Sequence, residues 1–304
     1  GSLFALGARN GRRAWIYRTH RCTAASPALH RGTVFASFMN RGECNQTKPG
    51  LDGLVAAVSV GQGKVHWTTK IGPTESSPLI AAGRVYVGDW RGNVYALNEA
   101  TGKIVWSAQT GGKVKAGVAY ARGRIFVGSY DGHVYAFDAR TGGRIWRASA
   151  QARLGSTATF YSTPAVAYGR VYLGATDGKV YSFGAVSGKL RWSHGTGGYV
   201  YSSPAVWNRR VYAGSYDHHF YCFDAATGDV RWSFDANGPI SGSATVIDGV
   251  VYFATLDGRT YGLNAVTGKQ VWTFPDGKYS PVVADTRRLY LVGYARVYGM
   301  VPRR

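Results

Sequence analysis

The stretch Ala96-Leu97-Asn98-Glu99-Ala100-Thr101-Gly102-Lys103-Ile104-Val105-Trp106 decides the fold, because the chain repeats it. A second clear copy runs from Ala136 to Trp146. Further copies, some of them weaker, end at Trp15, Trp67, Trp192, Trp232 and Trp272. A repeat of roughly 40 residues built from short strands is typical of propellers and solenoids. The spacing therefore predicts the architecture, and by itself no function.

One repeat divides into four short strands. Residues 77–81, 84–88, 93–97 and 103–106 carry apolar residues in alternation, and Gly, Asn or Asp stands at each break. Alternation between such breaks is the signature of strands joined by tight turns. Four antiparallel strands in one repeat make a propeller blade.

The repeats predict an all-β fold, a seven-bladed β-propeller of four-stranded antiparallel blades. We expect one domain over residues 1–304. The expected blades are 23–67, 75–106, 114–146, 161–192, 201–232, 241–272, and 279–304 together with 1–17. In the last blade the N- and C-terminal strands would share one sheet, which removes free edges. Segments 3–6 and 297–300 both fit its third strand, and the sequence leaves that choice open.

Composition restricts the class of protein. Apolar residues make up 45% of the chain and 42 residues are glycine, which fits a folded, turn-rich β protein. No apolar run is long enough for a membrane helix and no signal peptide is visible. Because the chain opens within a repeat, it is compatible with an upstream export signal or anchor. We expect an extracytoplasmic location, secreted, periplasmic or membrane-anchored.

The three cysteines support that location. Cys22 and Cys44 lie in the two most irregular connections of the first repeat, and we predict a disulfide between them. The alternative is a pair of unpaired surface thiols. Cys222 replaces an apolar residue inside a strand, so we expect it to be buried and inert. A disulfide would indicate an oxidising compartment.

The repeated phrase resembles the pyrroloquinoline-quinone (PQQ) type of propeller repeat, with its Ala-x-Asp/Asn-x-x-Thr-Gly-x-x-x-Trp tryptophan docking motif. The resemblance covers essentially the whole chain and implies that the repeat tryptophans are structural. Quinoprotein dehydrogenases form one branch of this family, with an adjacent-cysteine disulfide and a set of calcium ligands. This chain has no Cys-Cys pair, so it looks closer to the other branch, the outer-membrane β-barrel assembly propeller and exported propellers without chemistry. We therefore expect neither PQQ nor calcium as a cofactor.

Candidate catalytic and metal-binding groups are few. Asp131, Asp177 and Asp257 each precede a glycine in a turn, where Asp bonds its own backbone, and they belong to different blades. The neighbours His218 and His219 would face opposite sides of a strand and make a poor chelate. No nucleophile elbow, phosphate loop or zinc spacing occurs. We predict no catalytic residues and no metal site, although an enzyme site assembled from several blades remains the alternative.

Aromatic residues gather in two kinds of loop, the turns after the second strands and the loops leading into the first strands. In an up-and-down blade both kinds lie at the same end of the strands, around the channel mouth. The predicted ligand-binding residues are Trp90, Tyr130, Tyr216, Tyr294, Tyr161, Tyr201 and Lys115. Such rings suit a protein, peptide or glycan partner. The alternatives are packing between blades, or a PQQ-dependent or carbohydrate-active enzyme using the same mouth.

The chain carries a formal net charge of +20, from 36 Lys and Arg against 16 Asp and Glu. Several arginines fall in the turns after the first strands, at the end of the blades opposite the aromatic loops. The predicted anionic-surface residues are Arg84, Arg122, Arg124, Arg170, Arg209, Arg210, Arg287 and Arg288. An anionic lipid or a cell-wall polymer fits this charge, and ordinary solvated turns are the alternative. We expect no sequence-specific nucleic acid binding, a monomer, and a non-catalytic binding or scaffold function.

Overall fold

The computed structural model describes residues 1–41, 53–150, 158–279, 282–294 and 296–301. Within these ranges all the named secondary-structure elements are β-strands, and neighbouring strands pair antiparallel. The fold class is the predicted seven-bladed β-propeller. Over the same ranges no helical segment has the length and apolarity needed to span a bilayer.

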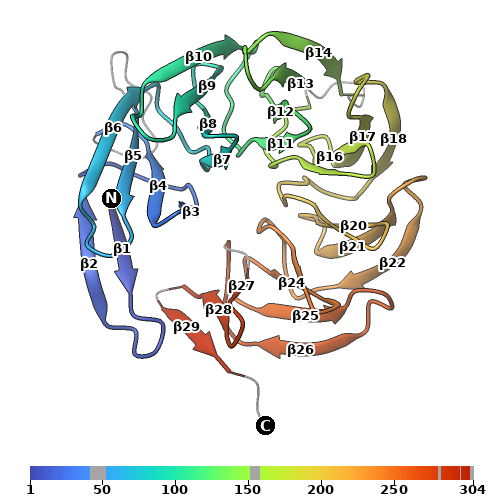
Figure 1. The fold of residues 1–304 in the computed structure, drawn as a ribbon. Helices are drawn as coiled ribbons and strands as arrows, with labels where there is room; N and C mark the ends of the chain where they lie inside the picture. The colour runs from blue at the N-terminus through green and yellow to red at the C-terminus, as the bar shows by residue number, and fades with distance from the viewer. Residues whose placement is uncertain (42–52, 151–157, 280–281, 295, 302–304) are drawn as a thin grey trace. The chain divides into compact units, whose positions relative to one another are not determined.

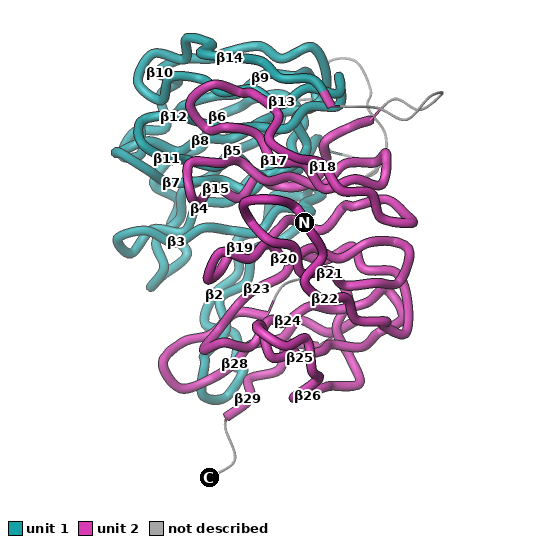
Figure 2. Tube along the Cα trace, turned by 90° about the vertical axis from the view of Figure 1, so that its right-hand side faces the viewer, with its two compact units in different colours: residues 1–149 teal, residues 150–304 magenta. Residues whose placement is uncertain are grey.

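The chain divides into two compact units, Gly1–Ser149 and Ala150–Arg304, drawn in different colours in Figure 2. Each is described by itself below. The assignment of the whole chain to one domain stays a prediction.

Unit 1 contains one two-stranded sheet and three four-stranded sheets (Figure 1). The two-stranded sheet pairs β1 (Ser2–Leu6) with β2 (Arg13–Arg18). The first four-stranded sheet consists of β3 (Ala28–His30), β4 (Thr33–Phe38), β5 (Gly53–Ser59) and β6 (Val65–Ile71). The second consists of β7 (Leu79–Ala81), β8 (Arg84–Gly88), β9 (Asn93–Asn98) and β10 (Ile104–Gln109). The third consists of β11 (Ala119–Ala121), β12 (Arg124–Gly128), β13 (His133–Asp138) and β14 (Arg144–Ser149).

Unit 2 contains three four-stranded sheets and one three-stranded sheet. The first consists of β15 (Ala165–Ala167), β16 (Arg170–Gly174), β17 (Lys179–Gly184) and β18 (Leu190–Gly195). The second consists of β19 (Ala205–Trp207), β20 (Arg210–Gly214), β21 (His219–Asp224) and β22 (Val230–Asp235). The third consists of β23 (Thr245–Ile247), β24 (Val250–Ala254), β25 (Thr260–Asn264) and β26 (Gln270–Phe274). The three-stranded sheet consists of β27 (Val283–Ala284), β28 (Leu289–Val292) and β29 (Val297–Met300).

Both segments that competed for the third strand of the terminal blade are strands. The N-terminal segment is β1, which pairs with β2, and the C-terminal segment is β29, which pairs with β28. Each therefore has a partner strand from its own end of the chain.

The strand order within each four-stranded sheet follows the sequence order. Within unit 1 the first strand β7 contacts the first strands β3 and β11, and within unit 2 β19 contacts β15 and β23. The second and third strands of each four-stranded sheet are mostly buried, whereas the fourth alternates between exposed and buried or half-buried residues. Each unit thus buries the middle of its sheets and leaves their fourth strands at the surface.

The Asn/Asp-x-x-Thr-Gly phrase builds the turn between the third and fourth strands. The Oδ1 of Asp138 accepts hydrogen bonds from the backbone N–H of Arg140 (2.9 Å) and Thr141 (2.8 Å), and from the Thr141 hydroxyl (3.0 Å). Asn98, Asp224 and Asn264 accept the two corresponding backbone bonds in their own turns. These bonds to the ionised form lower the pKa of Asp138, the bond from the Thr141 N–H most of all.

Tryptophans of three four-stranded sheets donate a hydrogen bond to the next sheet in the same unit, whereas the Nε1 of Trp232 has no hydrogen-bond partner among the described residues. The Nε1 of Trp67 donates to the carbonyl of Glu99 (2.9 Å), Trp106 to Ala139 (3.0 Å) and Trp192 to Ala225 (3.1 Å). Trp15 donates in the same way to Val60 (2.8 Å). A β-bulge directly before the tryptophan shifts the pairing of the fourth strand, and bulges re-aim side chains. Each ring lies against the turn glycine of the next sheet, such as Gly102 beneath Trp67.

Candidate functional site

The loops that lead into the first strands place one residue per sheet at an equivalent position. Glu75, Lys115, Tyr161 and Tyr201 all occupy it, and in three of the four sheets a buried serine follows. In the sheet of Tyr161, the serine Ser162 bonds Gly174 of the second strand, donating to its carbonyl (3.0 Å) and accepting from its N–H (2.8 Å). Because successive side chains point to opposite sides of an extended chain, the residue before this serine faces away from its own sheet. The equivalent position therefore meets neighbouring loops.

In unit 2 this position creates a cluster of rings, here called the tyrosine cluster: Tyr161, Tyr199, Tyr201 and Tyr216. Tyr201 lies at the centre. Its ring packs edge-to-face on Tyr161 (centroids 5.2 Å apart), Tyr199 (5.7 Å) and Tyr216 (5.0 Å). The backbone N–H of Tyr216 donates to the carbonyl of Tyr199 (2.9 Å), which fixes the two loops against each other. The edge-to-face geometry is the one that aromatic quadrupoles favour.

The tyrosine cluster is ordered by its own contacts and still reaches solvent. Tyr199 is 52% exposed, and Tyr161, Tyr201 and Tyr216 are half-buried. Burial raises the pKa of Tyr201, and the neighbouring Tyr216 and Tyr199 raise it further. The Tyr201 hydroxyl is therefore protonated at neutral pH and able to donate a hydrogen bond. Rigid rings with polar tips are the side chains most often found at the centre of protein interfaces.

In unit 1 the same loops create a tryptophan–lysine cluster of Glu75, Trp90, Lys113, Lys115 and Tyr130. The Nζ of Lys115 lies 4.4 Å from the centroid of the Trp90 ring and 5.3 Å from that of Tyr130. It also lies 3.6 Å from the carboxylate of Glu75 in the adjacent sheet. Lys113 approaches the Trp90 ring to 5.1 Å. Both ammonium groups are within the range of cation–π attraction.

Tyr294 lies in a third group, with Lys278 and Tyr279, in unit 2. The Nζ of Lys278 lies 5.4 Å from the Tyr294 ring centroid and 5.5 Å from that of Tyr279. Both rings are well exposed, Tyr294 at 84%. The backbone N–H of Tyr294 donates to Asp276 (2.9 Å), which anchors the loop and not the ring.

The structure therefore distributes the predicted ligand-binding residues over three groups. Trp90, Tyr130 and Lys115 contact one another in unit 1, and Tyr161, Tyr201 and Tyr216 contact one another in unit 2. Five participants are not among the predicted ligand-binding residues: Tyr199, Tyr279, Lys113, Glu75 and Lys278. Glu75 could have been found by aligning the repeats, because it stands at the position that Lys115 fills in the next sheet.

Asp131 and Asp177 lie in turns between second and third strands and accept hydrogen bonds from the backbone of those turns, as predicted. Asp131 accepts from the backbone N–H of His133 (3.0 Å) and Gly111 (2.9 Å) and from the Tyr135 hydroxyl. Asp177 accepts from the N–H of Lys179 (3.2 Å) and from the Tyr181 hydroxyl (2.5 Å). Over the residues described, no three His, Cys, Asp or Glu side chains come together as metal ligands would.

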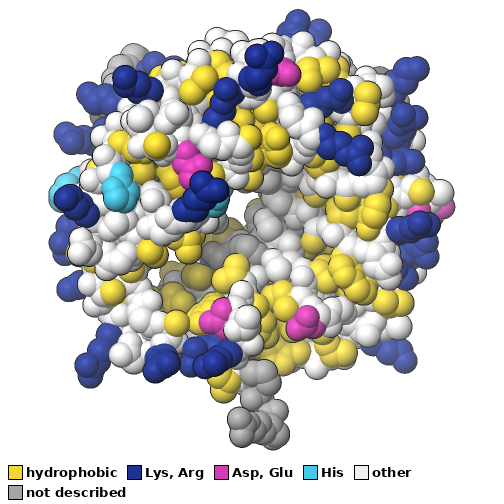
Figure 3. All heavy atoms as spheres, viewed as in Figure 1, with side chains coloured by type: hydrophobic (Ala, Val, Ile, Leu, Met, Phe, Trp, Pro, Cys, Tyr) yellow, Lys and Arg dark blue, Asp and Glu magenta, His cyan; other side chains and the backbone are white. Residues whose placement is uncertain are grey.

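The predicted anionic-surface arginines do lie in or beside the turns after the first strands. Some of them form hydrogen bonds within the protein. The Nη1 of Arg84 donates to the carbonyls of Ala139 (2.6 Å) and Arg140 (2.7 Å) in the next sheet. Arg287 and Arg288 are held through their backbone N–H groups by Asp285 (2.7 Å each). In the face drawn in Figure 3, Lys and Arg side chains are far more common than Asp and Glu.

Cys222 is a free, fully buried thiol, as predicted. Burial raises its pKa to about 12, against a smaller opposing effect of Arg210 and Arg231, so the reactive thiolate is absent at neutral pH. Cys44 lies outside the described residues, and the Cys22–Cys44 disulfide stays a prediction. The backbone carbonyl of Cys22 accepts from the N–H of Met39 (2.8 Å), which ties this connection to the end of β4.

Comparison with known proteins supplies the family. The family model described as outer membrane protein assembly factor BamB matches residues 51–217 and 194–299. Since these ranges cover most of the chain, the protein belongs to this family. No curated protein matched the sequence.

Solved structures share the fold at low identity. BamB from Moraxella catarrhalis superimposes with a TM-score of 0.75 at 19% identity, covering 94% of this chain and 85% of that one. A europium-containing methanol dehydrogenase gives 0.75 at 14% identity, covering 98% and 80%. The computationally designed protein Ika8 gives 0.70 at 14% identity, covering 93% and 100%. An outer membrane protein assembly factor, a dehydrogenase and a computational design thus share this architecture, which by itself assigns no function.

Proposed function

We propose that this protein is a non-catalytic propeller that binds a protein partner outside the cytoplasm, and that the tyrosine cluster is the contact surface. Membership of a family described by an outer membrane assembly factor supports the scaffold role and the location. The tryptophan contacts between sheets fit this role, because they hold neighbouring sheets together and so fix the positions of the loops that the sheets carry. By this proposal the chain holds no quinone and no calcium ion.

The observation that carries the proposal is the packing of Tyr201 against three other tyrosines. The four rings hold one another in place, so little side-chain entropy remains to be lost when a partner binds. Their hydroxyl groups can donate to backbone carbonyls of a peptide while the ring edges contact its apolar side chains. Energetically important interface residues are enriched in Tyr and are surrounded by contacts that exclude water.

A peptide array and a glycan array, probed side by side with the purified protein, test the proposal. The decisive variant replaces Tyr199, Tyr201 and Tyr216 by serine, which keeps the loops polar and removes the rings. We expect the wild-type protein to bind peptides on the array. The triple variant should bind them at least tenfold more weakly, a loss of about 1.4 kcal/mol in binding free energy. The variant Tyr201→Phe separates the ring from the hydroxyl and should lose less.

The matched control is Tyr120→Ser, because Tyr120 is an exposed tyrosine of unit 1 that stacks on Tyr86 and does not belong to the tyrosine cluster. It should bind like the wild type. Unchanged peptide binding by the triple variant would remove the tyrosine cluster from the proposal. Binding confined to glycans would replace the protein partner by a carbohydrate one.

A further inference from the structure

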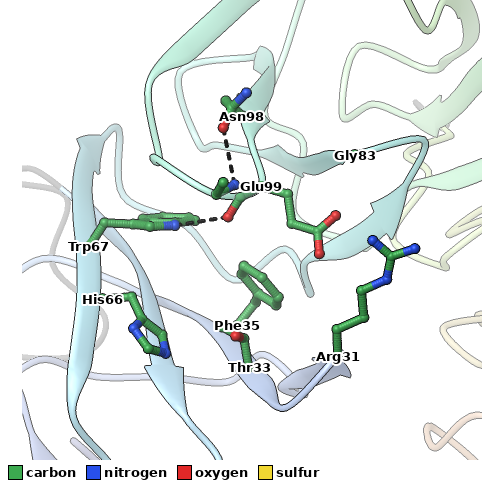
Figure 4. Close-up of a pocket in the computed structure, with 9 residues that line it drawn as sticks. Arg31, Thr33, Phe35, His66, Trp67, Gly83, Asn98 and Glu99 are labelled. Carbon is green, nitrogen blue, oxygen red and sulfur yellow. Dashed lines mark hydrogen bonds between the residues drawn. The ribbon is translucent and has the colours of Figure 1, made fainter.

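Two grooves of the molecule occupy the same place in the repeat. Each lies between the turn that joins the first two strands of one sheet and the Asn/Asp-x-x-Thr-Gly turn of the next. The groove of unit 1 (Figure 4) has a volume of about 480 Å³ and is lined by Arg31, Thr33, Gly83 and Glu99 among others. The groove of unit 2 has a volume of about 390 Å³ and is lined by Tyr168, Arg170, Arg209, Asp224 and Arg231 among others. Matching the repeats residue by residue shows what differs between them.

The groove of unit 1 contains its own anion. The Oε1 of Glu99 lies 2.6 Å from the Nδ1 of His30, and the Glu99 side chain is only 17% exposed. Figure 4 shows its carboxylate pointing toward the guanidinium of Arg31. The groove of unit 1 therefore has room for a carboxylate beside basic side chains.

The groove of unit 2 lacks that anion and holds more cations, because Ala and Arg, the residues most common in the repeats at the positions of Glu99 and Thr33, stand there. Alignment of the turns places Ala225 where Glu99 stands, Arg170 where Thr33 stands and Arg209 where Gly83 stands. Arg231 adds a third guanidinium, from a bulge position in β22. The lining carboxylate, Asp224, already bonds Arg231 and the backbone N–H groups of Ala226 (2.7 Å) and Thr227 (3.0 Å). Three cations against one anion leave two positive charges uncompensated.

Arg209 stands where the backbone favours glycine. Its φ is +57°, and the equivalent turn residues of the other described four-stranded sheets are all glycine, at φ +70° to +76°. The backbone N–H of Arg209 donates to the hydroxyl of Tyr168 (2.9 Å), which holds the two turns together across the groove. A non-glycine residue in this conformation is strained, and such strain is concentrated at functional positions.

Arg170 supplies an unused donor. Its Nη1 is buried and has no hydrogen-bond partner in the part of the chain that the structure describes. Arg84, at the same place in its sheet, donates from its Nη1 to two carbonyls of the next sheet, so Arg170 departs from the arrangement seen in unit 1. A buried donor without an acceptor is costly, and a carboxylate oxygen would satisfy it.

We propose that the groove of unit 2 binds a carboxylate side chain from an acidic segment of a protein partner. The carboxylate takes the place that Glu99 fills in unit 1 and is bound by Arg170 and Arg209, with Tyr168 and Arg231 at its edges. This groove shares no residue with the tyrosine cluster, so the two surfaces can be tested independently.

The probe is a fluorescein-labelled peptide of alternating Gly and Glu, compared by fluorescence anisotropy with its Gly and Gln counterpart at about 0.15 M salt, where distant charges are screened. We expect the Glu peptide to bind and the Gln peptide to bind at least tenfold more weakly. Arg209→Gly restores the usual turn residue, so it should raise the unfolding midpoint and still weaken the Glu peptide at least tenfold. Arg170→Gln should weaken it similarly.

Lys103→Gln is the control, because Lys103 is an exposed lysine in a unit 1 turn and its loss removes the same charge elsewhere; it should change the affinity less than twofold. Ala225→Glu introduces the carboxylate that Glu99 supplies in unit 1 and should compete with the peptide. Equal binding of the Glu and Gln peptides, or wild-type affinity in Arg209→Gly, would overturn the proposal. Free glutamate and phosphatidylglycerol vesicles are tested in the same way. If either binds through Arg209 while the Glu peptide does not bind, the ligand is not an acidic segment of a protein and the proposal is overturned. A triple tyrosine variant that still binds the Glu peptide separates this site from the tyrosine cluster.

Discussion

The contact between a tryptophan and the next sheet can be measured with two glycine substitutions in the sheet β7–β10. Gly102 and Gly83 have nearly the same backbone conformation, φ +71° and +72°. A Cβ on Gly102 would lie 2.5 Å from Cε3 of Trp67, whereas a Cβ on Gly83 would meet nothing within 4 Å. The left-handed conformation costs an alanine about 1–2 kcal/mol at either position. Overpacking against a buried ring adds about 1–3 kcal/mol at Gly102 alone.

We therefore expect Gly83→Ala to lower the free energy of unfolding by about 1–2 kcal/mol and Gly102→Ala to lower it by about 2–5 kcal/mol. Urea unfolding followed by tryptophan fluorescence and by circular dichroism measures both. The background Trp67→Leu supplies the test of cause, because without the ring the excess cost at Gly102 should shrink to what the contact of the new Cβ with Oγ1 of Thr69 (2.8 Å) leaves. Equal losses in the wild-type background, or an unchanged difference in Trp67→Leu, would refute the docking contact as the reason.

Four further outcomes are expected, two from the structure and two from the sequence. Burial raises the pKa of Tyr172 to about 12, so an unfolded chain ionises this tyrosine from pH 10 upward while the folded chain does not. The stability that Tyr172 contributes below pH 10 should therefore fall by about 1.4 kcal/mol per pH unit between pH 10 and 12, measured as the difference in slope between the wild type and Tyr172→Phe. Peptide mapping without reductant should recover Cys22 and Cys44 in one cross-linked fragment, and two separate alkylated fragments would contradict the predicted disulfide. Adding PQQ with calcium should leave the unfolding temperature unchanged, whereas a saturable rise would contradict the absence of a quinone site. Co-sedimentation with anionic liposomes should weaken steeply as salt rises, and a flat response would remove lipid from the partners of the arginine turns.

The strand pattern could be read from the sequence because it is local. Residues 84–88 were predicted as a strand and form β8, and 93–97 differ from β9 by one residue. The fourth strand was placed at 103–106, and β10 runs from Ile104 to Gln109, three residues further. Apolar alternation marks the buried middle strands clearly, whereas the exposed fourth strand gives a weaker signal after its tryptophan.

Contacts between sheets could not be read in the same way, because they depend on how one blade lies on the next. The sequence identified Lys115 as a positive charge among aromatic rings, and missed that Glu75 of the adjacent sheet neutralises part of it at 3.6 Å. It also presented Arg84 as a surface charge, although Arg84 donates two hydrogen bonds to the next sheet. A residue's partner across blades appears only when repeats are aligned and the same position is compared in neighbours.

Comparing equivalent positions can also identify functional residues in a repeat protein. The repeat fixes the backbone at each position, so a residue that serves only the fold should agree with its equivalents. Arg209 disagrees with five glycines and keeps a strained conformation, whereas Ala225 and Arg170 are of the residue types most common at their positions. Natural sequences depart from local rules mainly at functional sites. The departure at Arg209 adds a guanidinium to the groove in which the Nη1 of Arg170 has no hydrogen-bond partner among the described residues, which is why a ligand explains it better than an isolated substitution would.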